Sequence, residues 1–167
     1  MTLISRFLPD IEAQGNPIRT MWDRLRDRPG GKAVFSRLLG VMAPYTGTIG
    51  ARIEELGVGH ARVTLRDRRA VRNHLRCIHA IALVNLAEVT GNLALGYGLP
   101  DDARFIPVGI SIEYLKKARG TVTGVTDCVL PAFTETRDFE VPVSIRNSDG
   151  EEVARAVMKT RVGPKMH

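Results

Sequence analysis

Hydrophobic residues recur at two different spacings along this chain, and the first stretch has the spacing of helices. After Pro17, which suits the first turn of a helix, apolar residues follow three or four positions apart: Ile18, Met21, Trp22 and Leu25. A second helix is predicted from Lys32 to Met42, between the glycine pair at 30–31 and Pro44. Residues 1–16 lack such a pattern and are expected to be a loosely structured lead-in.

From Thr48 the spacing changes to two, the period of a strand with one buried face. Apolar and charged positions alternate from Ile49 to Glu54, and again from Ala61 to Arg66 after the turn at 57–59. Two alternating runs joined by a glycine turn predict a β-hairpin. The hairpin follows the helices directly, without a linker.

The stretch from Cys77 to Pro100 is apolar on every side of a helix, not along one stripe. Such a helix is either buried or spans a membrane, and its length is near the roughly 20 residues that spanning requires. Polar side chains in this stretch would each need a partner inside a membrane: His79, Asn85, Glu88 and Asn92. The sequence therefore predicts a central core helix and no membrane span.

Strand-like runs return after Pro107 and continue to the end of the chain. Four are predicted, at 110–114, 121–129, 139–145 and 153–162, and Pro142 indicates an edge strand or a bulge. The order of helices, hairpin, long helix and four-strand meander predicts an α+β fold, with an antiparallel sheet around a helix. We expect one globular unit, in which residues 1–44 are a helical extension and residues 45–167 hold the sheet and the central helix.

The charge of the chain favours anionic partners without choosing among them. Lys and Arg number 24 against 18 Asp and Glu, which gives a formal net charge of +6. The basic residues form two clusters: Arg66, Arg68, Arg69 and Arg72, and then Lys116, Lys117 and Arg119. Because there is no long basic run and only 5% of residues are aromatic, we expect no nucleic-acid partner. The two cysteines make no disulfide framework and the N-terminus has no signal-peptide pattern, so a cytoplasmic location is expected.

Glu88 is the position most informative about function, since a carboxylate on a buried helix is costly to keep ionised without partners. One interpretation is structural: Asn85 and Asn92, three residues before and four after, share its face and could hydrogen-bond to it, or an arginine could pair with it across an interface. The other is functional, because buried acids gather at active sites. The residues alone leave both open.

A second candidate lies at the start of the same helix, where backbone N–H groups lack partners and carry a partial positive charge. A carbonyl oxygen placed there would be polarised, as in an oxyanion hole. His79 stands at this start, either as a core histidine or as a proton-transfer group, and Asn73 precedes it by six residues. Cys77 is expected to be an apolar filler, and no Cys/His spacing indicates a metal site.

The segment Asn73-His74-Leu75-Arg76-Cys77-Ile78-His79-Ala80, followed by Glu88, resembles the signature of hotdog-fold acyl-CoA thioesterases, in particular their phenylacetate-pathway type and its uncharacterised-domain branch. That signature has an Asn, a His-Gly-Gly six residues later at a helix start, and an Asp or Glu nine residues after the His. Both spacings match here. The segment 114–120 is also similar to a strand end of these proteins, and the element order matches over roughly residues 45–163.

The resemblance implies a hotdog fold, an acyl-CoA substrate, no separate cofactor or metal, and a homodimer or dimer of dimers. In that family the site forms where two subunits meet. The Ala80 N–H would polarise the thioester carbonyl, Glu88 of the partner subunit would be general base or nucleophile, and Asn73 would orient the water or the carboxylate. His79 begins the helix in the same motif. The second basic cluster would bind the phosphates of coenzyme A; the other interpretation is a solvated strand end.

The sequence departs from the family pattern at Ala80 and Ile81, where two glycines are usual, and at Arg76, which is often glycine. The Ala80 methyl crowds the approach of the carbonyl, and Ile81 narrows the mouth of the site. The alternative function is therefore a hotdog protein that binds acyl-CoA or fatty acyl chains without hydrolysing them. A hotdog dehydratase is disfavoured, because no Pro- and Gly-rich loop carrying a histidine precedes Glu88.

Overall fold

The computed structural model describes residues 15–130 and 135–165, which form one antiparallel sheet around a long helix. In chain order the elements are α1 (Pro17–Leu25), α2 (Gly31–Met42), α3 (Pro44–Gly47), β1 (Arg52–Gly57), β2 (His60–Leu65), the 3-10 turn η2 (Arg69–Val71), α4 (Ala80–Gly98), β3 (Ala103–Tyr114), β4 (Val122–Asp127), β5 (Arg137–Arg146) and β6 (Glu152–Pro164). The predicted α+β class is confirmed. The expected lead-in lies almost entirely outside the described residues.

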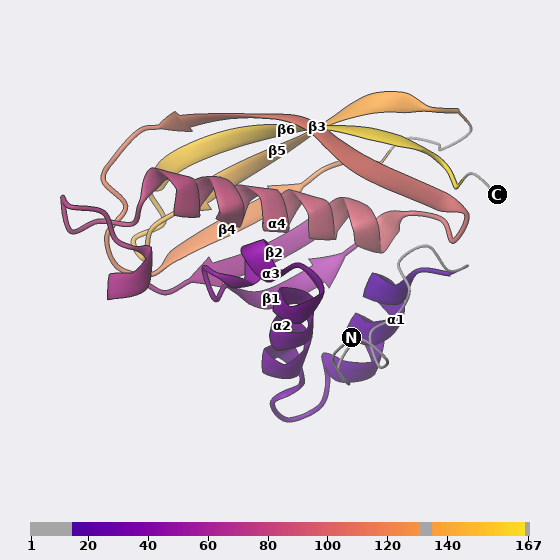
Figure 1. Ribbon diagram of the computed structural model, residues 1–167, viewed down its shortest axis with the longest axis horizontal. Coiled ribbons are helices and arrows are strands. Elements are labelled where there is room, and N and C mark those ends of the chain that lie inside the picture. The colour runs from indigo at the N-terminus through magenta and orange to yellow at the C-terminus, as the bar shows by residue number, and fades with distance from the viewer. Residues whose placement is uncertain (1–14, 131–134, 166–167) are drawn as a thin grey trace.

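The six strands lie in the order β1-β2-β4-β5-β6-β3, and every neighbouring pair is antiparallel (Figure 1). The predicted hairpin is confirmed by β1 and β2, and β4, β5 and β6 form a meander. The prediction that all four later strands form one meander is wrong, because β3 pairs with β6 and not with β4. The chain leaves the sheet through α4 and re-enters it at the opposite edge.

Two prolines lie within strands. β3 begins at Ala103, earlier than predicted, and a bulge between Pro107 and Gly109 lets it continue past the proline. Pro142 lies in β5, which is internal in the strand order, but β4 pairs with β5 only from Ser144 to Arg146, so Pro142 is at a local edge, as predicted. Its backbone faces the point where β4 has already separated from β5, and the hydroxyl of Thr126 donates to the Pro142 carbonyl at 2.5 Å. The missing N–H therefore costs no ladder hydrogen bond.

α4 lies in the concave side of the sheet, as predicted for a core helix. Its buried side chains, such as Leu86 and Leu93, belong to one core with β2, β4 and β5. A Cβ added at Gly124 of β4 would come within 2.5 Å of the Thr90 hydroxyl, so glycine permits the close approach of sheet and helix. By length and composition alone α4 could cross a membrane, but 67% of that stretch is buried within the protein.

α2 covers the β1 edge of the sheet. The hydroxyl of Ser36 accepts the N–H of Ile53 at 3.0 Å, and Lys32 donates to the carbonyl of Glu54 at 2.6 Å. These bonds satisfy backbone groups that an open edge would offer to another chain. At the opposite edge, β3 receives no such cover from the rest of the described chain. The β1 edge of this sheet is thus covered by a helix, and the β3 edge is open.

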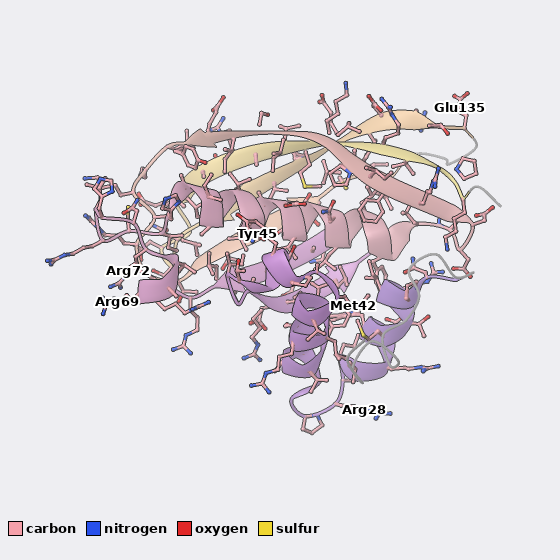
Figure 2. All side chains as sticks on the ribbon, viewed as in Figure 1. Arg28, Met42, Tyr45, Arg69, Arg72 and Glu135 are labelled. Carbon is pink, nitrogen blue, oxygen red and sulfur yellow. The ribbon has the colours of Figure 1, made fainter. Side chains whose placement is uncertain are left out.

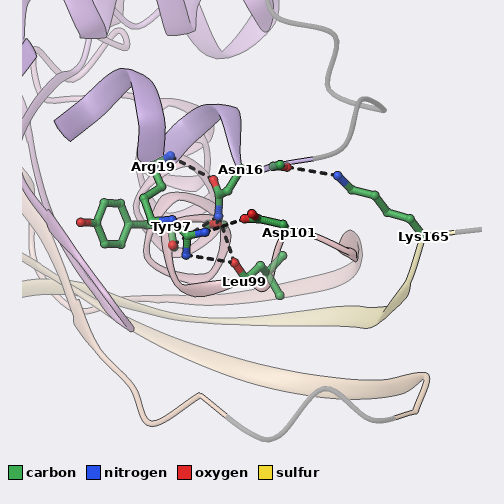
Figure 3. Close-up of polar contacts among 8 residues, drawn as sticks. Asn16, Arg19, Tyr97, Leu99, Asp101 and Lys165 are labelled. Atoms are coloured by element: carbon green, nitrogen blue, oxygen red, sulfur yellow. Dashed lines mark hydrogen bonds and ion pairs between the residues drawn. The ribbon is translucent and has the colours of Figure 1, made fainter. Parts of the chain in front are cut away.

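α1 closes the C-terminal end of α4 through Asn16, whose side chain is 92% buried (Figure 3). The Asn16 Oδ1 accepts the N–H of Arg19 and so caps α1 at 2.9 Å. Its Nδ2 donates to the carbonyls of Gly96 at 2.7 Å and Leu99 at 3.1 Å. These carbonyls belong to the last turn and the C-cap of α4, where helices leave acceptors unpaired. One side chain therefore serves two helix ends.

Replacing Asn16 by Ala should lower the free energy of unfolding by about 2–4 kcal/mol, because a helix cap contributes about 1 kcal/mol and unpaired buried carbonyls cost about 1–3 kcal/mol. Urea denaturation followed by circular dichroism measures this. The control is Arg26→Gln, which removes partly exposed ion pairs with Asp23 and Asp27 and should cost less than about 1 kcal/mol. Equal losses for the two variants would show that Asn16 does not clamp α4.

Candidate active site at the start of the central helix

A tight loop brings the chain to the start of α4, and Asn73 holds it together. The Asn73 Oδ1 accepts the N–H of Leu75 at 2.9 Å and that of Cys77 at 3.4 Å, while its own N–H donates to the Cys77 carbonyl. Arg76 closes the loop with φ +56°, a left-handed conformation that favours glycine, which fits the glycine usual at this position in the family signature. The side-chain oxygen of Asn73 is thus occupied, and within this side chain only the NH₂ group is left to orient a ligand.

His79 is the N-cap of α4 and not the core histidine that one interpretation predicted. Its side chain is exposed, and its Nδ1 accepts the N–H of Ile81 at 3.1 Å. The His79 carbonyl accepts the N–H groups of Ala82 and Leu83. The His79 ring therefore serves as an exposed helix cap, and its position does not depend on burial in the core.

The first turn of α4 leaves one backbone donor unpaired. The N–H groups of Ile81, Ala82 and Leu83 all bond to His79. Among the first four N–H groups of α4, that of Ala80 alone finds no acceptor in residues 15–130 and 135–165. It lies at the positive end of a 19-residue helix. A free donor at this end can polarise a carbonyl oxygen.

Glu88 lies on an incompletely covered stripe of α4 formed by Ile81, Val84, Glu88 and Asn92. Its carboxylate is half-buried and makes no hydrogen bond or ion pair with any described residue. The predicted bonds from Asn85 and Asn92 are wrong. The Asn85 Nδ2 donates instead to the Tyr45 carbonyl of α3 at 3.2 Å, and Asn92 makes no hydrogen bond to Glu88. Eight residues separate Glu88 from Ala80, a distance of about 12 Å along the helix axis.

A cavity of about 350 Å³ brings together four of the predicted site residues, Asn73, Ala80, Lys116 and Lys117. The Ile78 N–H donates to the Ala118 carbonyl at 2.9 Å, which holds the lysine segment beside the start of α4. Tyr114 also lines the cavity, and its hydroxyl donates to the Ala80 carbonyl at 3.3 Å. Partial burial raises the pKa of the Tyr114 phenol, so it stays protonated as a donor. His79 and Glu88 do not line this cavity.

The basic residues near this cavity are unequal candidates for binding phosphate. Lys116 already pairs with Glu151 at 2.7 Å, and Arg119 is exposed outside the cavity lining. Sequence reasoning did not assign the other cluster, although Arg69 and Arg72 lie near the same end of α4 (Figure 2). Both are exposed, and Arg72 pairs with Asp67 at 2.6 Å. The concentration of arginines at 66–72 was the available signal. In the part of the chain that the structure describes, no three His, Cys, Asp or Glu residues are grouped to hold a metal.

Known structures share this fold. That of the structural-genomics protein APC5556 has a TM-score of 0.78 and 35% identity, covering 88% of this chain and 98% of that one. The protein PA5026 of Pseudomonas aeruginosa, described as a probable thioesterase of unknown function, has a TM-score of 0.70 and 18% identity, covering 79% and 95%. The thioesterase HI1161 of Haemophilus influenzae has a TM-score of 0.67 and 17% identity, covering 78% and 92%.

These likenesses confirm the hotdog fold that the Asn73–Glu88 signature implied. No curated protein matches the chain. The model of a family described as a domain of unknown function, DUF4442, matches residues 31–162, which include α2, the whole helix α4 and most of the sheet. The chain therefore belongs to the DUF4442 family and has the hotdog fold.

Proposed function

We propose that this protein hydrolyses acyl-CoA thioesters at a site shared by two subunits. The observation that carries the proposal is the unpaired Ala80 N–H at the start of α4, in the wall of a cavity beside two lysines. A donor fixed at a helix N-terminus stabilises the oxyanion that forms when a thioester carbonyl is attacked. The thioesterases among the proteins of like fold support the same reaction class.

The second catalytic group is Glu88, and it must come from another chain. In one subunit Glu88 lies about 12 Å along α4 from Ala80, too far for both to act on a single carbonyl. Glu88 is half-buried and has no partner in the described residues, so its carboxylate is available to a molecule that covers the open stripe of α4. In the proposed dimer, a two-fold axis next to this stripe would place Glu88 of each subunit near Ala80 of the other.

In the proposed reaction, the substrate carbonyl oxygen accepts the Ala80 N–H. The Glu88 carboxylate either takes a proton from water, which attacks the carbonyl carbon, or attacks the carbon itself to form an anhydride that water then opens. Collapse of the tetrahedral intermediate breaks the carbon–sulfur bond, and the thiolate leaves and is protonated. The free NH₂ group of Asn73 orients the water or the carboxylate. Water and the thioester suffice, so the proposal includes no cofactor.

The uncovered edge strand β3 supplies the surface on which the two subunits join. It is 12 residues long, and apolar side chains along it are exposed: Ile106, Val108, Ile110 and Tyr114. A long apolar edge is a template for pairing with another chain, whereas the β1 edge is already covered by α2. Pairing of two β3 strands would continue the sheet across the dimer.

The variant Ile110→Lys should therefore be monomeric at micromolar concentration and should lose thioesterase activity, because it places a charge in the middle of the joined edge. Sedimentation velocity measures the first effect and thiol release the second. The control is Val129→Lys, at a side chain 90% exposed beyond the end of β4, which should change neither. A fully dimeric, active Ile110→Lys protein with an unaltered unfolding midpoint would rule out the β3 interface.

The experiment that tests the function is a thiol-release assay with short, medium, long and aryl acyl-CoAs. Turnover above the rate without enzyme for at least one acyl class is expected. The alternative, a protein that binds acyl-CoA without hydrolysing it, predicts a raised melting temperature with acyl-CoA and no thiol release from any of the four classes. That second outcome would refute hydrolysis.

A further inference from the structure

A second cavity, of about 210 Å³, lies between α3, the segment 70–72 and the first turns of α4. His79 and Ile81 line it, while Ala80 between them lines the cavity described above, so the two cavities flank the start of α4. Figure 2 shows Tyr45 on α3 and Arg72 at the end of the molecule where α4 begins, and both residues line this second cavity. The proposed reaction does not use it.

Asn85 is the buried polar residue of this cavity, with a side chain 97% buried. Its Nδ2 donates to the Tyr45 carbonyl at 3.2 Å, which fixes the orientation of the amide. Its Oδ1 is buried and accepts no hydrogen bond within residues 15–130 and 135–165. A buried acceptor without a donor costs free energy, so this oxygen suits a ligand that brings a donor.

The Tyr45 carbonyl does not depend on Asn85. It also accepts the backbone N–H of Thr48 at 3.1 Å and the Thr48 hydroxyl at 2.6 Å. Asn85 is therefore not needed to satisfy α3, and its unpaired oxygen is not explained by the packing of that helix.

The position of Asn85 places an unpaired acceptor on the same end of α4 as the Ala80 N–H. Along the axis of α4, Asn85 lies about 7.5 Å beyond Ala80, whose N–H holds the carbonyl in the proposed reaction. In a thioester of coenzyme A or of a carrier protein, the first group that carries a donor on the thiol side is an amide N–H, two methylenes from the sulfur. That spacing fits an acceptor on the thiol side of the thioester. Arg72, which pairs with Asp67 at 2.6 Å, is the exposed charged residue in the lining of the same cavity.

We propose that Asn85 is a specificity residue for the thiol half of the substrate, and that its Oδ1 accepts the cysteamine amide N–H of the pantetheine arm. The proposal rests on the proposed thioesterase function and adds to it the recognition of a carrier thiol. The site would then discriminate against thioesters of thiols that lack this amide, because the Asn85 Oδ1 stays unpaired when they bind.

The test compares one acyl group on three thiols: coenzyme A, N-acetylcysteamine, which keeps the first amide, and butanethiol, which has none. The variant Asn85→Leu has a side chain of similar size and lacks the acceptor. It should lower kcat/KM about tenfold for the first two esters and leave the butanethiol ester unchanged. Thr48→Val removes another hydrogen bond to the Tyr45 carbonyl but keeps the Asn85 oxygen, and this control should show no dependence on the amide.

Equal losses on all three esters would make Asn85 a structural residue and overturn the proposal. A second comparison uses plain and hydroxylated acyl-CoAs. If Asn85→Leu lowers kcat/KM only for the hydroxylated acyl groups, Asn85 contacts the acyl half of the substrate, and the proposal is overturned as well. Binding of free pantetheine separates this inference from the hydrolysis itself. Pantetheine should raise the melting temperature of the unaltered protein but not of Asn85→Leu, whether or not any thioester is hydrolysed, and equal or absent shifts would contradict the proposal.

Discussion

Glu88→Gln is expected to lower kcat for the best acyl-CoA by about two to four orders of magnitude, because the amide can neither accept a proton from water nor attack the carbonyl. The fold should survive, since the Glu88 carboxylate has no hydrogen bond or ion pair among the described residues and its replacement breaks no internal contact. Steady-state thiol release measures kcat, and thermal unfolding checks stability.

The matched control is Glu140→Gln, an exposed glutamate on β5 between inward-facing side chains. This variant should retain full activity. Glu88→Asp keeps the carboxylate but shortens its reach, and it should recover part of the rate that Glu88→Gln loses. Full activity of Glu88→Gln on every hydrolysable substrate would remove Glu88 from the mechanism.

Ala80→Pro is expected to lower kcat by about two to three orders of magnitude, the usual effect of removing one oxyanion-hole donor. Proline deletes the N–H, and the first position of a helix tolerates it. The preceding His79 has φ −65° and ψ 141°, the extended conformation that a residue before proline prefers. The loss should therefore appear in thiol release and not in the melting temperature.

Ala80→Gly is the control for this substitution, because it keeps the N–H and removes only the methyl group that crowds the carbonyl. Its activity should equal or exceed that of the unaltered protein. If Ala80→Pro hydrolyses thioesters as fast as Ala80→Gly, the free N–H of α4 has no part in the reaction.

The sequence predicted most of the fold because its signals were local. The period of two in the hairpin and the apolar run of α4 are properties of neighbouring residues. α4 and β2 form where expected, and β1 begins three residues later than the alternation predicted. The start of α4 was also predictable, since Asn73 and His79 accept backbone N–H groups a few positions away. The place of β3 was not, because its choice of β6 over β4 depends on contacts between distant segments.

The same limit applies to the candidate site. Asn85 and Glu88 share the spacing that allows a hydrogen bond on a helix, but the nearby Tyr45 carbonyl takes the Asn85 NH₂ instead. Tyr45 is 40 residues away in the chain, so no helical pattern could show it. His79 was ambiguous because its polarity does not reveal whether a helix start faces the core or the outside, and the structure places it outside. Lys116 likewise finds its partner on a distant turn, at Glu151.

The most direct measurement of the central claim is the activity of a purified mixed dimer with Glu88→Gln in one chain and Ala80→Pro in the other, each carrying a different affinity tag. If each site combines Ala80 of one chain with Glu88 of the other, one site of the mixed dimer is intact and the other has both defects, so about half of the unaltered activity returns. If both groups of a site come from the same chain, each site carries one defect, and the mixed dimer stays as inactive as either parent.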